Sequence, residues 1–281
     1  MANWGRILSR GNVEDRRGMP LGIAGGGLGV VGVALVIIFN LLNGGDITDV
    51  LNGLQTIQVQ TEQQYTQKDF EGADSYEVFA STVLGSTNDM WSRFFAENNF
   101  TYDPPKLVLF RQATQSGCGI ASSDVGPHYC PLDEVIYLDE TFFDELRTRF
   151  GAQGGDVAEA YVIAHEVGHH VQNELGIMEQ VQSQQVSDQE ANDLSIKLEL
   201  QADCFAGLWA YSVKDLGVFE PGEITEAIDA AAAVGDDRIQ QRVTGRINPE
   251  TWTHGSSAER SSWFNRGFET GSVAQCNTFN Q

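Results

Sequence analysis

Two histidines spaced four residues apart constrain this chain more than any other feature. They belong to the segment His165-Glu166-Val167-Gly168-His169, which follows the apolar run AYVIA. The periodicity predicts one helix from Val157 to about Leu175, with Gly176 as its terminator. Residues four apart lie on one face of a helix, so both imidazoles can reach a single metal ion. The pattern predicts a zinc site on this helix, with Glu166 as a base that does not bind the metal.

A zinc site that performs chemistry needs a third protein ligand and one open position for water. Our candidate is Glu199, on a predicted helix from about Gln189 to Lys214, because its apolar neighbours make an unpaired carboxylate costly there. Asp203 lies four residues on, on the same face, and is predicted to accept a hydrogen bond from the free ring nitrogen of a zinc-bound histidine. The alternatives for the third ligand are Glu174, Glu190 and Asp193.

When a zinc-activated water attacks a carbonyl group, negative charge develops on the carbonyl oxygen. This oxyanion needs a hydrogen-bond donor besides the metal. His254, in a Gly/Ser-rich turn, is the candidate, although a turn histidine that bonds only locally is an alternative interpretation. Tyr211 and Tyr137 are comparable alternative candidates. His170 follows His169 directly and points about 100° away on the helix, so we expect it to pack beside the site.

Leu21 to Phe39 is a run of nineteen residues without a charge. This length can cross a bilayer as a helix, whereas the apolar core of a cleaved signal is usually about 7 to 15 residues. A cleaved signal and a buried soluble helix remain alternatives. Four arginines precede the run and two aspartates follow it, which predicts a cytoplasmic N-terminus. The predicted division is a cytoplasmic segment 1–20, a transmembrane anchor 21–43, a polar linker 44–72 and a domain 73–281.

The rest of the chain predicts an α+β domain that is mostly helical with a small β-sheet. Strands are expected at Lys106–Arg111 and Glu134–Leu138. Further helices are expected at Ser75–Asn98, Glu140–Phe150, Pro221 to near Val234, and after a capping box formed by Ser256 and Glu259. The Glu134–Leu138 strand is our candidate edge for docking an extended substrate.

Four cysteines lie beyond the uncharged run, on its predicted outer side. Disulfides are favoured over a structural zinc because no Cys-x-x-Cys pair is present. Cys118 and Cys130 flank a short loop and form the expected local pair, which leaves Cys204 to bond Cys276.

Acidic residues dominate the charge of the chain. The 39 Asp and Glu residues against 17 Lys and Arg give a formal net charge of −22. Nucleic acid binding requires a positive field, and no basic stripe offsets this deficit. The composition therefore argues against a nucleic acid partner.

Several segments together resemble a bacterial family, the putative neutral zinc metallopeptidases. The resemblance is carried by NVEDRRG at 12–18, by Cys118-Gly119 with Tyr129-Cys130-Pro131, by HEVGHHVQ, by ELQADCFAGLW and by His254-Gly255-Ser256-Ser257. It covers nearly the whole chain and implies a membrane-anchored protein with a zincin-like domain. It also implies His165, His169 and Glu199 as ligands, as in glutamate-zincins, and Glu166 as the catalytic base.

The resulting expectation is a membrane-anchored zinc endopeptidase that acts on proteins or peptides outside the cytoplasmic membrane. Glu166 would accept a proton from the attacking water and return it to the departing amine. The alternative is a non-catalytic, extracytoplasmic zinc module that binds peptides or takes part in envelope assembly. A purely structural zinc site has no need of Glu166, which favours the enzyme.

Overall fold

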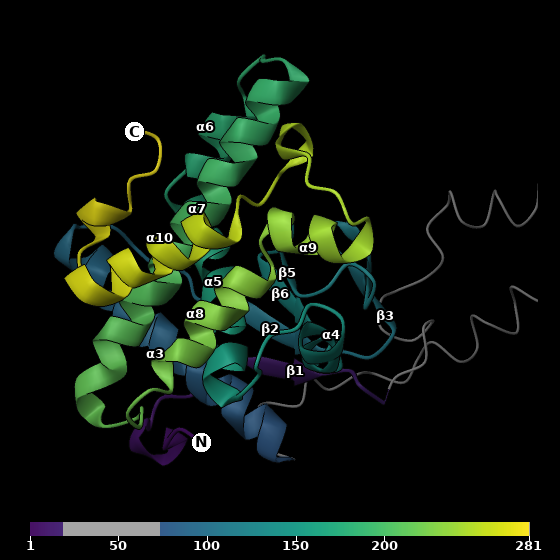
Figure 1. Cartoon of the computed structure of the whole chain (residues 1–281). Coiled ribbons are helices and arrows are strands. Elements are labelled where there is room, and N and C mark those ends of the chain that lie inside the picture. The colour runs from purple at the N-terminus through teal and green to yellow at the C-terminus, as the bar shows by residue number, and fades with distance from the viewer. Residues whose placement is uncertain (19–73, 281) are drawn as a thin grey trace, which may run out of the picture. The chain divides into compact units, whose positions relative to one another are not determined.

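A computed structural model describes residues 1–18 and 74–280 and has the predicted α+β class, mostly helical with small sheets. Figure 1 shows the helices gathered around α5, with the main sheet beside them. The strands are β1 (Val13–Asp15), β2 (Lys106–Leu109), β3 (Ala113–Ser116), β4 (Gly119–Ser122), β5 (His128–Cys130) and β6 (Val135–Leu138). The α-helices are α3 (Ser75–Glu97), α4 (Phe142–Thr148), α5 (Asp156–Glu174), α6 (Ile177–Gln182), α7 (Asp188–Val213), α8 (Ile224–Ala233), α9 (Asp236–Val243) and α10 (Ser257–Thr270).

The main sheet has the strand order β1-β2-β6-β5. The β1–β2 and β2–β6 pairs are parallel, whereas β5 is antiparallel to β6. Strand β6, expected to offer a free edge, lies between two other strands, so that expectation was wrong. The free edge on that side is β5, within the part of the chain that the structure describes. Sequence patterning missed β5 because it has only three residues, between Pro127 and Pro131.

Helix α5 lies at the centre of the helical half and packs against α7, α8, α3 and β5. Its apolar run is buried almost completely, as the continuous hydrophobic pattern before the first histidine requires. Helix α7 begins at a capping box in which Ser187 and Glu190 each bond the other's backbone amide. Helix α10 begins at the predicted box of Ser256 and Glu259 and packs along α7.

The N-terminal residues pack with the helices and strands of the predicted domain. Met1–Arg17 belongs to the same compact unit as the described residues 74–280, and β1 supplies one edge of the main sheet. The predicted anchor, 21–43, lies outside the described residues. Within the described residues, no helix is long and apolar enough to cross a membrane.

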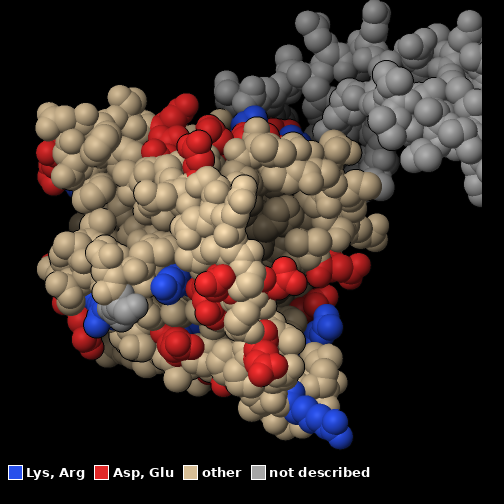
Figure 2. Space-filling view, turned by 90° about the horizontal axis from the view of Figure 1, so that it is seen from above, with Lys and Arg blue, Asp and Glu red and all other residues tan. Residues whose placement is uncertain are grey.

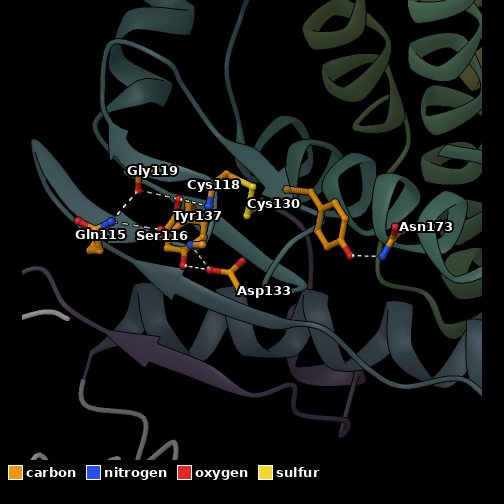
Figure 3. Close-up of a disulfide and its surroundings, with 10 residues drawn as sticks. Gln115, Ser116, Cys118, Gly119, Cys130, Asp133, Tyr137 and Asn173 are labelled. Carbon is orange, nitrogen blue, oxygen red and sulfur yellow. Dashed lines mark hydrogen bonds between the residues drawn. A yellow bond between two sulfur atoms is a disulfide. The ribbon is translucent and has the colours of Figure 1, made fainter. Parts of the chain in front are cut away.

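Both predicted disulfides are present. Cys118 bonds Cys130, which ties the β3–β4 turn to β5, and Cys204 bonds Cys276, which ties α7 to the C-terminal segment. Figure 3 shows the first of these, with Asp133 and Tyr137 beside it. Disulfides are typical of proteins outside the cytoplasm, so the pairing supports an extracytoplasmic domain.

Candidate metal centre

His165, His169 and Glu199 form a compact group of potential metal ligands. The Nε2 atoms of His165 and His169 each lie 3.3 Å from a different carboxylate oxygen of Glu199. One ligand atom from each residue lies within 4.8 Å of the others. Two imidazoles and a carboxylate are a donor set that zinc accepts, and the three residues can therefore hold a metal ion.

A close approach of α5 and α7 brings these residues together. A Cβ atom added at Gly168 would lie 3.1 Å from the Cα of Ala202. Gly168 of α5 and Ala202 of α7 face each other at this point, and their small size lets the two helices approach closely. This crossing places Glu199 and Asp203, one helical turn apart, against the two histidines.

The second ring nitrogen of each histidine has its own acceptor. His165 donates from Nδ1 to Oδ1 of Asp203 at 2.9 Å, as the sequence predicted. His169 donates from Nδ1 to Oε1 of Gln172 at 2.9 Å, a partner that the sequence analysis missed. Gln172 in turn donates to the carbonyl of Leu198 on α7. Such partners fix the tautomer and leave both Nε2 atoms free to bind a metal.

Arg260 of α10 completes the surroundings of Asp203. Its Nε donates to Oδ2 of Asp203 at 2.8 Å and its Nη2 donates to Oδ1 at 3.0 Å. Tyr161 donates its hydroxyl to the same Oδ1 at 2.5 Å. Burial by itself would raise the pKa of Asp203, but Arg260 and His165 outweigh it and hold that pKa below its usual value. The carboxylate that orients His165 is therefore ionised at neutral pH.

Sequence reasoning did not single out Arg260. Its guanidinium also lies 3.6 Å from Glu199, and its side chain is only 4% exposed. Burial raises the pKa of Glu199, yet His169 and His165 lower it well below its usual value. The sequence shows an arginine in the helix after the Ser256 capping box, but it does not show that this side chain is buried against Asp203.

Glu166 is buried and lies outside the ligand group, next to it on α5. It faces a cavity that also contains the three potential ligands and His254. His254 is half exposed, and its Nδ1 lies 3.2 Å from Asp236 at the start of α9. The cavity thus brings together five of the predicted residues from separate parts of the chain: His165, Glu166, His169, Glu199 and His254.

The other residues considered from the sequence have separate roles. Burial lowers the pKa of His170 to about 4, and this ring bonds Tyr129 and the carbonyl of Asp103. The alternative third ligands and oxyanion donors lie outside the group: Glu174 accepts from the amide of Asp103, Glu190 caps α7, Asp193 is exposed, Tyr137 donates to Asp133, and Tyr211 packs under Lys214.

An HExxH helix facing a carboxylate on a second helix defines a metallopeptidase-type centre. The chain belongs to the family described as Putative neutral zinc metallopeptidase, whose model matches residues 2–279. It is 46% identical over 275 residues to the uncharacterized protein YpfJ of Escherichia coli K12, with 95% of each chain covered. It is 50% identical over 188 residues to the uncharacterized protein Rv2575 of Mycobacterium tuberculosis H37Rv, with 63% of each chain covered. No solved structure matches the chain.

Replacing Asp203 tests the role of the histidine partner. Asp203→Asn removes the negative charge that favours the donated proton of His165 and takes from Arg260 the nearer of its two carboxylate partners. We expect zinc affinity to fall by about 10- to 100-fold, measured by competition with a fluorescent chelator. Asp193→Asn, at an exposed position of the same helix, should leave the affinity unchanged. Equal affinities in a folded Asp203→Asn protein would contradict the assignment.

Proposed function

We propose that this protein is a zinc-dependent endopeptidase that hydrolyses peptide bonds outside the cytoplasm. The observation that carries the proposal is the shared cavity, in which His165, His169 and Glu199 stand beside Glu166. The two disulfides support the extracytoplasmic location. The uncharged run at 21–39 supports association with the cytoplasmic membrane.

Zinc held by His165, His169 and Glu199 would act as a Lewis acid and would make a water molecule easier to deprotonate near neutral pH. Glu166 is the general base in this proposal, because it faces the cavity from the ligand helix without belonging to the ligand group. It takes the proton of the attacking water and returns it to the nitrogen of the departing amine. Asp203 and Gln172 keep the two imidazoles oriented throughout.

His254 is our proposed donor to the carbonyl oxygen of the scissile bond. It lines the cavity on the side of α9, and its Nδ1 donates to Asp236, so its Nε2 can donate to a substrate oxygen when the ring carries both protons. Asp236 also accepts the backbone amides of Thr253, His254 and Gly255, which fixes the turn that carries the ring. A donor held in this way stabilises charge that appears only in the transition state.

The edge strand beside the cavity and the charge of the surface support a proposal for how a peptide binds. The edge strand β5 lines it through His128 and Tyr129, so an extended substrate can add to the sheet there by main-chain hydrogen bonds. On the face shown in Figure 2, Asp and Glu side chains are more widespread than Lys and Arg, which disfavours polyanionic substrates.

An apolar wall lies next to the potential metal ligands in the same cavity. Val162 precedes His165 by three residues, so it lies on the same face of α5. Ile239 of α9 belongs to the same wall. We propose that this wall receives an apolar side chain next to the scissile bond. Its other members are Phe142, Phe150 and Val234.

The base is tested by Glu166→Gln. We expect hydrolysis of an unfolded protein by the full-length, zinc-loaded chain in detergent to fall by at least about 100-fold, with bound zinc retained. Glu174→Gln makes the same chemical change on the same helix away from the cavity, and should keep full activity. A wild-type protein that binds zinc but is as inert as the variant would favour the non-catalytic peptide-binding module.

Removing the proposed oxyanion donor should affect the chemical step. We expect His254→Ala to lower kcat by about 100- to 1,000-fold with little change in KM, because the interaction forms mainly in the transition state. Steady-state kinetics on a fluorogenic peptide measure both constants. An unchanged kcat would assign His254 to the local structure of its turn alone.

The apolar wall is tested by a charge. We expect Ile239→Lys to lower kcat/KM at least about tenfold for peptides with Leu or Phe beside the scissile bond, relative to peptides with Ala there. Val243→Lys places the same charge one turn further along α9 at a residue that is 59% exposed, and should leave the preference unchanged. The same loss in both variants would point to net charge instead of the wall.

A further inference from the structure

We propose that the N-terminal residues up to Arg17 lie on the same side of the membrane as the metal centre. The sequence predicts the opposite, because a single crossing at 21–43 would leave them in the cytoplasm. The inference goes beyond the proposed function and does not depend on catalysis. It also explains the segment NVEDRRG, which the metal centre does not use.

The first observation is the pairing of β1 with β2. Val13, Glu14 and Asp15 stand beside Leu107, Val108 and Leu109 in parallel register. The amide of Leu107 donates to the carbonyl of Asn12 at 3.0 Å, and the amide of Arg16 donates to the carbonyl of Leu109 at 2.7 Å. Val13 is 1% exposed. A strand of the main sheet cannot be separated from that sheet by a bilayer.

The second observation is the contact with α3. The amide of Gly11 donates to the carbonyl of Ser81, and the Ser81 hydroxyl donates back to the carbonyl of Gly11. A Cβ atom added at Gly85 would lie 2.5 Å from the backbone nitrogen of Arg10. Helix α3 therefore has a glycine at the position where the N-terminal backbone crosses it. A side chain at that position would clash with the backbone of Arg10.

The third observation links the segment to the ligand helix. The indole nitrogen of Trp4 donates to Asp156, the first residue of α5, at 2.8 Å. Its ring stacks on Trp209 of α7 and meets Phe79 of α3 edge-on. The N-terminal segment thus contacts both helices that carry the metal centre.

The chain leaves and re-enters this unit at one place. Arg17 forms ion pairs with Asp15, with Glu140 and with Asp74, the residue that caps α3. A single crossing of the membrane between Arg17 and Asp74 would put these partners on opposite sides. These ion pairs therefore require Arg17 and Asp74 to lie on the same side of the membrane.

Thiol labelling in spheroplasts tests the inference. All four native cysteines are paired, so a cysteine introduced at an exposed position is the one free thiol. Leu8 is 88% exposed on the N-terminal segment, and Leu132 is 78% exposed beside β5. Leu8→Cys and Leu132→Cys are each made in the full-length chain, expressed in a Gram-negative host, and treated in spheroplasts with a membrane-impermeant maleimide. The unaltered chain and a cytoplasmic thiol protein serve as unlabelled controls.

We expect both variants to be labelled before lysis to the same extent. Labelling of Leu132→Cys with protection of Leu8→Cys until lysis would overturn the inference and restore a cytoplasmic N-terminus. Protection of both until lysis would support the inference but overturn the extracytoplasmic location in the proposed function. Loss of activity in a Glu166 or His254 variant bears on neither outcome.

Discussion

The close crossing of α5 and α7 is the contact on which the rest of the site depends. Gly168 and Ala202 let the two backbones approach. The three potential metal ligands come from the helical turns on either side of that crossing. A Cβ atom at position 168 would come so close to Ala202 that α7 would have to shift by a few tenths of an ångström. The candidate metal centre therefore depends on the packing of α5 against α7, because that packing brings the three potential ligands together.

Helix α10 and the N-terminal segment secure that crossing from two directions. Arg260 supplies two hydrogen bonds that keep Asp203 ionised and oriented, because a buried carboxylate needs a charged partner. Trp4 meets the first residue of α5 and stacks on α7. Segments near both ends of the chain thus hold the two ligand helices, in keeping with a family match that spans residues 2–279.

The buried polar groups next to the histidines have distinct hydrogen-bond partners. Asp203 and Gln172 each accept from one ring, and His170 bonds Tyr129 and the carbonyl of Asp103. Glu166 stands apart from these pairs, with its side chain in the cavity. Separation of the orienting groups from the candidate base lets that base exchange a proton without disturbing the ligands.

The sequence by itself determined the local elements of this protein. The four-residue spacing of His165 and His169 requires one helical face, the box of Ser256 and Glu259 starts α10, and loop length indicated the pairing of Cys118 with Cys130. Gln172 lies three residues after His169 on the same helix, so local spacing could have indicated it. Local pattern could not reveal β1, β5 or Arg260, because their positions depend on residues far away in the chain. The side of the membrane inferred for the N-terminus follows from tertiary structure for the same reason, since a charge pattern describes the flanks of a segment but not which strand pairs with them.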